Sequence, residues 1–146
     1  MLFYSINFLV MKKIVWDKSL NVGIAEIDLQ HQNFINILNE LFVVFYDMER
    51  QPQQIINIFD QALNYAKYHF ATEERYFYEF QYEEAGKHIE EHRNFGLKLY
   101  ELRKQFETEK IDPTIDLMEF FEDWLVYHLN SMDKKYTKCF HDHGLV

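Results

Sequence analysis

Apolar residues recur along this chain at alternating steps of three and four, the spacing of amphipathic helices. After an irregular leading segment over 12–23, the inward positions of the first stretch are Ile24, Ile27, His31, Phe34, Leu38, Leu41 and Phe45. The second stretch opens with a proline, a residue suited to the first position of a helix, and its inward positions are Ile55, Phe59, Ala62, Ala66, His69, Glu73, Tyr76 and Phe80. The spacing therefore predicts two long helices in the first half of the chain, the second of them starting at Pro52.

The same spacing predicts two further helices. The third starts near Gly86, with inward positions at Ala85, His88, His92, Phe95, Leu99, Leu102 and Phe106. In the fourth, Asp112 and Pro113 fit an N-cap and a first helical residue, and the inward positions are Leu117, Phe121, Trp124, His128 and Met132. Connections of only a few residues force neighbouring helices to run antiparallel. We therefore predict an all-α fold, an antiparallel up-down-up-down four-helix bundle with an N-terminal irregular arm.

Length and composition agree with one such domain. The chain has 146 residues, of which 48% are hydrophobic and 27% charged, as in a globular protein. Four glycines and two prolines are too few turn residues for a β-sandwich or barrel. We expect the chain to consist of three segments: an apolar extension of unclear status over 1–11, the helical domain over 12–140 and a frayed tail over 141–146.

The charge balance bears on the kind of partner. A net charge of −9 repels phosphate backbones and anionic lipid surfaces, so nucleic acid and membranes are poor partners. The apolar run over 1–10 is also shorter than the roughly 20 residues that span a bilayer. The single cysteine, Cys139, cannot form an internal disulfide, which suits a reducing compartment. We expect a cytoplasmic monomer.

The polar residues at or near the inward faces are all imidazoles or carboxylates. They are His31, His69, Glu73, His88, His92, His128 and Asp133. Burying such groups is costly unless they are paired or bound to a metal. A single inward histidine is more often an ordinary core residue, but here every predicted helix contributes a residue of this type. Antiparallel packing can bring these residues to one level, so we predict a metal site inside the bundle.

The spacing within the helices supports this prediction in part. His69 with Glu73, and His88 with His92, are i, i+4 pairs that place both side chains on one face of a helix. The residues His128 and Asp133 are i, i+5, about 140° apart on an ideal helix. Either they flank the inward line and reach in from both sides, or the helix widens locally by a π-type turn.

The types of ligand restrict the metal. Imidazole and carboxylate without a nearby thiolate suit iron, manganese, copper, nickel or zinc rather than calcium. If both carboxylates bridge two ions and a solvent-derived oxo or hydroxo group is added, all but one of about twelve places around two octahedral ions are filled. An open place on a redox-active pair is where a small ligand such as O2 would enter.

These residues occur within motifs that resemble the hemerythrin family, especially the single-domain bacteriohemerythrins. The resemblance covers about residues 12–140, and its motifs are Ile14-Val15-Trp16-Asp17, the run 22–31 ending in Gln30-His31, His69-Phe70-Ala71-Thr72-Glu73-Glu74, His88-Ile89-Glu90-Glu91-His92, and Trp124-Leu125-Val126-Tyr127-His128 with Asp133. One departure is Glu83, where the family often has proline. It concerns a turn and none of the candidate ligands.

The resemblance implies a non-haem di-iron centre (Fe2+/Fe3+) with an oxo or hydroxo bridge. One ion would be held by His88, His92 and His128, the other by His31 and His69, with Glu73 and Asp133 bridging. O2 would bind at the ion that has two histidines. By position relative to the motifs, the apolar O2 pocket would be lined by Phe34, Trp124, Leu125 and Leu129, which would exclude water. The same four residues are also suited to an ordinary core.

The leading functional hypothesis is therefore a non-enzymatic protein that binds O2 reversibly, as a carrier, a store or a sensor, with an O2-consuming protein as a candidate partner. One alternative is a di-iron oxidase or peroxidase. Oxygen-activating bundles use Glu-x-x-His pairs, which this chain lacks, and five neutral imidazoles favour reversible binding. The other alternative is an iron-binding or metal-stress protein, which needs no apolar O2 pocket and which the sequence leaves open.

Overall fold

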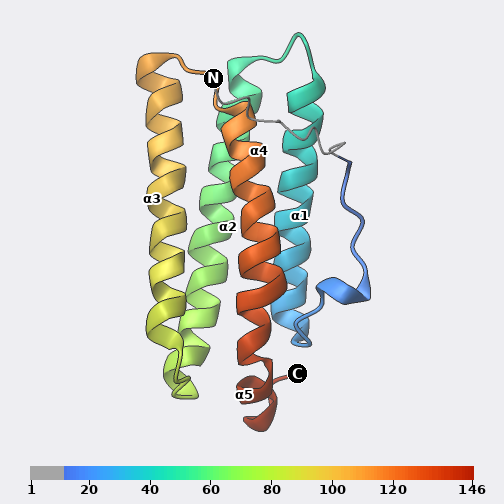
Figure 1. Cartoon of the computed structure of the whole chain (residues 1–146), viewed down its shortest axis with the longest axis vertical. Helices are drawn as coiled ribbons and strands as arrows, with labels where there is room; N and C mark the ends of the chain where they lie inside the picture. Colours follow the sequence, from blue (N-terminus) through green and yellow to red (C-terminus); the bar gives the residue numbers. More distant parts are fainter. Residues whose placement is uncertain (1–11) are drawn as a thin grey trace, which may run out of the picture.

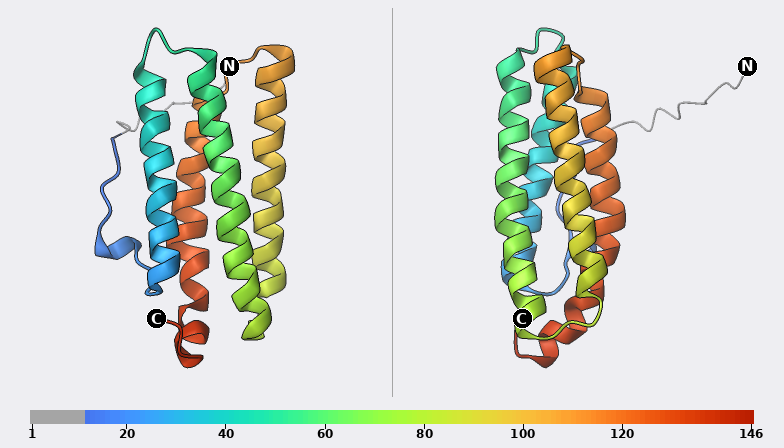
Figure 2. Two further views of the ribbon diagram at one scale, coloured as in Figure 1. Left: turned by 180° about the vertical axis from the view of Figure 1, so that it is seen from behind. Right: turned by 90° about the vertical axis from the view of Figure 1, so that its left-hand side faces the viewer.

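The computed structural model describes residues 12–146, which form a bundle of four helical columns (Figure 1). Three columns are single helices: α1 (Ala25–Tyr46), α2 (Pro52–Glu79) and α3 (Ala85–Glu109). The fourth is composite. It begins as α4 (Thr114–Asp123) and continues as the π-helix η2 (Trp124–Met132), the 3-10 helix η3 (Asp133–Tyr136) and α5 (Thr137–Asp142). Short connections join antiparallel neighbours (Figure 2), which confirms the predicted fold class.

The helix starts follow the local sequence. Helix α2 begins at Pro52 as predicted, and Gln51 N donates to Gln54 Oε1 at 2.5 Å in a reciprocal cap. Helix α4 begins at Thr114, one residue later than predicted, because Pro113 has a ψ of 4° and remains outside the helix. The carboxylate of Asp112 still caps this end, since its Oδ1 accepts from Thr114 N at 2.9 Å.

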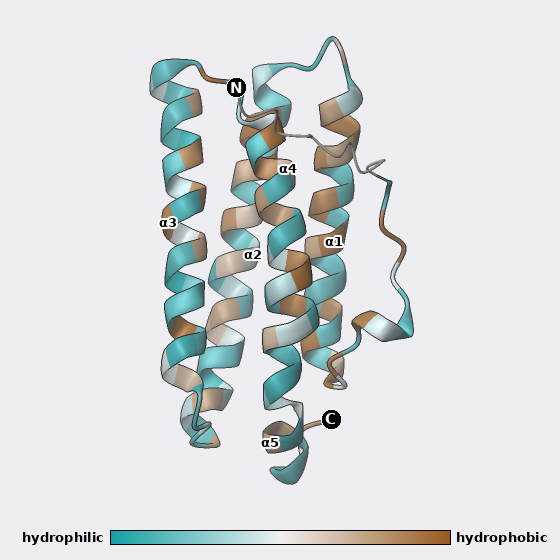
Figure 3. Ribbon diagram, viewed as in Figure 1, coloured by the Kyte–Doolittle hydropathy of each residue, from teal (hydrophilic) through white to brown (hydrophobic). Residues whose placement is uncertain are grey.

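Apolar residues alternate with polar ones along each column (Figure 3), and the buried apolar residues form two clusters. Phe34 belongs to the larger cluster and Ile27 to the smaller. These residues lie about one turn to either side of His31 on α1, so a polar layer separates the two clusters. None of the helices within residues 12–146 has the length and apolar character that a membrane crossing requires.

The predicted irregular arm runs beside α1 before the first long helix (Figure 1). It contains one short 3-10 turn, η1 (Lys18–Leu20). The carboxamide of Asn39 on α1 makes two hydrogen bonds with the backbone of the arm. It accepts from Ile14 N and donates to Ile14 O, both at 2.8 Å. The arm is therefore fixed to the bundle.

The end of the chain differs from our expectation of a frayed tail over 141–146. Helix α5 extends to Asp142, and His141 Nε2 lies 2.7 Å from Gly23 O. The ring of His143 stacks on Phe80 with centroids 4.5 Å apart. Phe140, which is fully buried in the smaller cluster, anchors this segment. The extension expected over 1–11 lies outside the described residues.

Candidate metal centre

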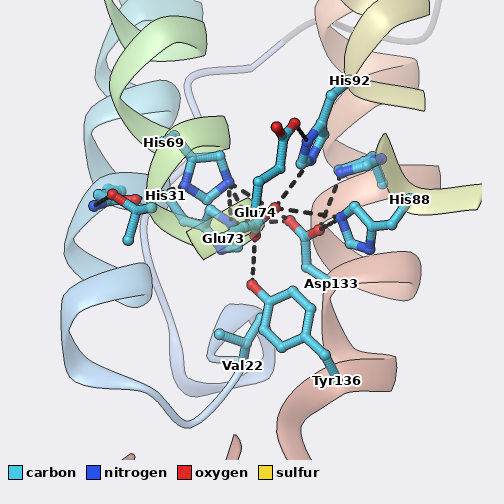
Figure 4. A network of polar contacts seen from close by, with 12 residues as sticks. Val22, His31, His69, Glu73, Glu74, His88, His92, Asp133 and Tyr136 are labelled. Carbon is cyan, nitrogen blue, oxygen red and sulfur yellow. Dashed lines mark hydrogen bonds and ion pairs between the residues drawn. The ribbon is translucent and has the colours of Figure 1, made fainter. Parts of the chain in front are cut away.

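The seven polar inward residues come together in one buried cluster inside the bundle (Figure 4). Their exposed fractions run from 0% to 4%. The set draws on all four columns: His31 from α1, His69 and Glu73 from α2, His88 and His92 from α3, and His128 and Asp133 from η2 and η3. The structure thus places every candidate ligand in one site.

The carboxylate of Glu73 lies between two groups of histidines. Its Oε1 is 3.2 Å from His69 Nε2. Its Oε2 is 3.0 Å from His92 Nε2 and 3.3 Å from His88 Nε2. Each oxygen of this carboxylate therefore faces a different group.

Asp133 divides the histidines in the same way. Its Oδ2 is 3.0 Å from His31 Nε2, and its Oδ1 is 2.8 Å from His88 Nε2 and 3.0 Å from His128 Nε2. The Nε2 atoms of His31 and His69 are 3.3 Å apart. The two carboxylates thus separate a group of two histidines from a group of three.

A local change of helix type brings Asp133 into line with His128. Residues Trp124–Met132 form a π-helix, and the N–H of Asp133 donates to the carbonyl of His128, an i to i+5 hydrogen bond. Residues five apart therefore lie one above the other on this face. Of the two alternatives that the sequence left open, the structure has the π-type turn.

The electrostatics of the cluster depend on contact between opposite charges. Burial alone would raise the pKa of Glu73, but the adjacent His69 and the two α3 histidines hold it well below its usual range. Burial and the nearby Glu73 likewise tend to raise the pKa of Asp133, and His128 and His31 hold it well below its usual range. Both carboxylates are therefore anionic at neutral pH.

Negative charge in turn favours a bound cation. Burial lowers the pKa of His88, but contact with Asp133 and Glu73 outweighs burial and raises that pKa to about 9. A proton on His88 therefore partly offsets the two carboxylates. A metal ion bound to Nε2 would take the place of this proton, since imidazole coordinates metals in its neutral form.

Unpartnered buried atoms test whether the cluster fits a metal. Within residues 12–146, Nε2 of His88, His92 and His128, Oε2 of Glu73 and both Asp133 oxygens are buried without a hydrogen bond. Such atoms are nearly always paired in proteins. Here the atoms are close together but lack hydrogen-bond geometry. The residues of the cluster form two sets of potential metal ligands, which share Glu73, and within each set the ligand atoms lie within 4.8 Å of one another. The residues present fit a pair of metal ions.

A second layer of polar side chains orients two of the rings. Oε1 of Gln30 lies 2.7 Å from His69 Nδ1, and Oε1 of Glu74 lies 2.9 Å from His92 Nδ1. In both cases the Nε2 atom is left facing the interior of the cluster. Contacts of this kind fix the tautomer and direction of a metal-binding histidine.

A tyrosine completes the second layer. Tyr136, which is fully buried, donates its hydroxyl hydrogen to Glu73 Oε1 at 2.5 Å. Sequence analysis missed Gln30, Glu74 and Tyr136. Their only signal is position, because Gln30 and Glu74 are adjacent to candidate ligands and Tyr136 is three residues beyond Asp133.

The four candidate pocket residues are all buried in the larger apolar cluster: Phe34, Trp124, Leu125 and Leu129. Trp124 stacks on the ring of His128, with centroids 3.7 Å apart and planes at 9°. The ring of Phe34 is 4.9 Å from that of Tyr65, which stacks on His69 at 5.0 Å. An apolar and aromatic layer therefore covers one side of the cluster.

Fold and site together define a four-helix bundle with an interior metal-binding cluster.

Comparison with known proteins identifies the family. The family model of the Hemerythrin HHE cation binding domain matches residues 22–139. A bacteriohemerythrin of Stenotrophomonas maltophilia is 32% identical over 127 residues, covering 87% of this chain and 81% of the relative. One of Methylococcus capsulatus is 29% identical over 119 residues, covering 82% and 88%. The crystal structure of a hemerythrin variant is 25% identical, with a TM-score of 0.79 and coverage of 88% and 98%. The chain belongs to the hemerythrin family.

Proposed function

We propose that this protein binds O2 reversibly at a non-haem di-iron centre. The observation that carries the proposal is the division of five histidines into groups of two and three by two carboxylates, each with one oxygen toward either group. Two ions held in this way would be unequal. The group with fewer histidines would leave its ion room for a small ligand.

The proposed ligands follow from the atoms that converge. His88, His92 and His128 would hold one ion and His31 and His69 the other, and Glu73 and Asp133, each with one oxygen toward either group, would serve both. Iron, when bound together with an oxo or hydroxo bridge, supplies the redox chemistry that O2 binding requires. Gln30, Glu74 and Tyr136 keep the ligand atoms directed inward.

The apolar residues on one side of the cluster would form the O2 pocket. Phe34, Trp124, Leu125 and Leu129 are at most 8% exposed and offer a small neutral ligand an environment from which water is excluded. Excluding water protects reduced iron, because water and protons promote its irreversible oxidation. We assign these four residues this protective role.

We propose binding of O2, and not its use as an oxidant, because of the kinds of ligand in the site. Five imidazoles, which are neutral when they bind a metal, and only two carboxylates converge here. Anionic ligands stabilise highly oxidised iron, and neutral ligands do so less. The site therefore favours a carrier, store or sensor of O2 over an oxidase.

The optical spectrum of the purified, iron-loaded protein tests this function. The protein is reduced without air, exposed to air, and deoxygenated again. We expect a visible absorption band that appears with O2 and disappears when O2 is removed, over several cycles. A single irreversible conversion to the ferric protein would contradict reversible binding.

A further inference from the structure

The candidate ligands are at most 4% exposed, so a metal ion has to pass between the columns to reach them. Three hollows in the described surface extend inward as far as a histidine of the cluster. The first, of about 410 Å³, lies against His69, the second, of about 60 Å³, against His88, and the third, of about 220 Å³, against His128. Each is a potential route between solvent and the cluster.

The charge of the lining distinguishes the three hollows. The first has no aspartate, glutamate, lysine or arginine in its lining. The second has two lysines, Lys87 and Lys135, and one glutamate, Glu84. The third has Glu91 and Asp123, and neither a lysine nor an arginine. Of the three, the third therefore attracts a cation most strongly.

This third hollow, which we call the α3–α4 hollow, has an exposed acidic rim and a buried inner wall. Glu91 on α3 and Asp123 at the end of α4 are exposed. Trp124 and His128, which line the same hollow, are 6% and 2% exposed. The hollow thus leads from two carboxylates at the surface to a candidate ligand of the three-histidine group.

Further acidic residues surround Asp123. Glu122 precedes it directly, and Glu119 lies one turn earlier on α4. Burial raises the pKa of Glu122, and the nearby carboxylates of Asp123 and Glu119 raise it further. Negative potential therefore accumulates on the α4 side of the hollow, where it draws cations toward the rim.

The histidine at the inner wall is held less firmly than two of the other ligands. The Nδ1 atoms of His69 and His92 each contact a side-chain oxygen at 2.7 and 2.9 Å. In His128, Nε2 is 3.0 Å from Asp133 Oδ1, whereas Nδ1 is buried with no hydrogen-bond partner among residues 12–146. No hydrogen bond at Nδ1 is therefore lost when this ring turns from the cluster toward the hollow.

We propose that the α3–α4 hollow is the entry site for divalent cations, at which Glu91 and Asp123 capture Fe2+ and His128 transfers it into the cluster. Carboxylate oxygens and an imidazole nitrogen are both suitable ligands for this ion. The inference rests on the proposed metal-binding function and adds to it the route by which metal enters and leaves. Neither carboxylate belongs to the final site.

Exchange of bound iron tests the entry site. The reduced, iron-loaded protein is mixed without air and at low salt with Fe2+ of a heavy isotope, and the isotope composition of the bound iron is followed by mass spectrometry. We expect Glu91→Gln combined with Asp123→Asn to slow exchange about tenfold, because entering and leaving ions both pass the rim. The content should stay at two irons per chain. High salt should reduce the difference from the wild type.

The matched control is Glu109→Gln combined with Asp116→Asn. It removes two exposed carboxylates from the same two helices, away from the hollow, and should leave the exchange rate unchanged. Exchange at the wild-type rate in the rim variant, or equal slowing in the control, would overturn the entry site and leave the proposed function standing. Loss of iron from the rim variant at equilibrium would overturn it as well, because the carboxylates would then belong to the final site. A wild-type protein that binds no iron would overturn both proposals.

Discussion

At the scale of single residues, two histidines of the cluster, His69 and His92, have polar contacts on both ring nitrogens. The Nε2 atom of His92 faces Glu73 at 3.0 Å, while its Nδ1 atom contacts Glu74 and its ring stacks on Phe70 at 3.9 Å. Such a ring has little freedom to turn, and its ligand atom is oriented before any metal binds. Orientation in advance favours both affinity and choice of metal.

Removing one histidine tests the assignment of ligands. We expect His92→Ala to lower the iron content from two ions per chain toward one and to lower the Tm, because metal binding is coupled to folding. Metal analysis and thermal unfolding of the same preparation measure both effects. The control His143→Ala alters an exposed histidine outside the cluster and should keep both irons. If His92→Ala kept two irons and its Tm, the assignment would be wrong.

The role that we propose for Leu125, as a wall residue of the O2 pocket, can be tested separately from metal binding. Leu125 is 8% exposed and belongs to the larger apolar cluster. We expect Leu125→Ala to admit water and to accelerate autoxidation several-fold at unchanged iron content, measured as the decay of the O2-dependent absorption. Val126→Ala, at a neighbouring exposed position, should have no such effect. An autoxidation rate equal to that of the wild type would mean that Leu125 is an ordinary core residue without a role in excluding water.

At the scale of elements, the spacing of the sequence predicted the columns but not their local geometry. A stripe with a repeat of 3.6 residues gives the extent of α1 and α2 directly. The same repeat cannot distinguish an α-turn from a π-turn at His128 and Asp133, because the wider turn is stabilised by contacts that Asp133 makes with other columns. Those contacts are tertiary, and the sequence of one helix does not contain them.

The contact between α5 and the segment before α1 was also hidden from sequence analysis, because its partners are 118 residues apart. Gly23 has φ of +87°, and a Cβ atom there would lie 3.3 Å from the His141 ring. We expect Gly23→Ala to lower the free energy of unfolding by about 1 kcal/mol or more in chemical denaturation.

The comparison for this substitution is Gly96→Ala in α3. An added Cβ at Gly96 meets nothing within 4 Å, so alanine should leave the stability unchanged or raise it by roughly 0.5–1 kcal/mol. Equal effects of the two substitutions would mean that the contact of α5 with the leading segment contributes nothing to stability.

At the scale of the whole molecule, the bundle and the cluster were predictable for the same reason. Imidazoles and carboxylates at inward helical positions are rare enough to stand out, and antiparallel packing leaves them few places to lie. The second layer was not predictable, since Gln30 and Glu74 resemble ordinary surface residues until the structure places them against His69 and His92. Their role depends on distances between columns, which periodicity does not supply.

The central claim is that one chain holds two iron ions between its four columns. The most direct test is metal analysis of the full-length protein, expressed with iron available and purified without chelators, with protein concentration measured independently. We predict two irons per chain. A single zinc per chain under these conditions would contradict the claim.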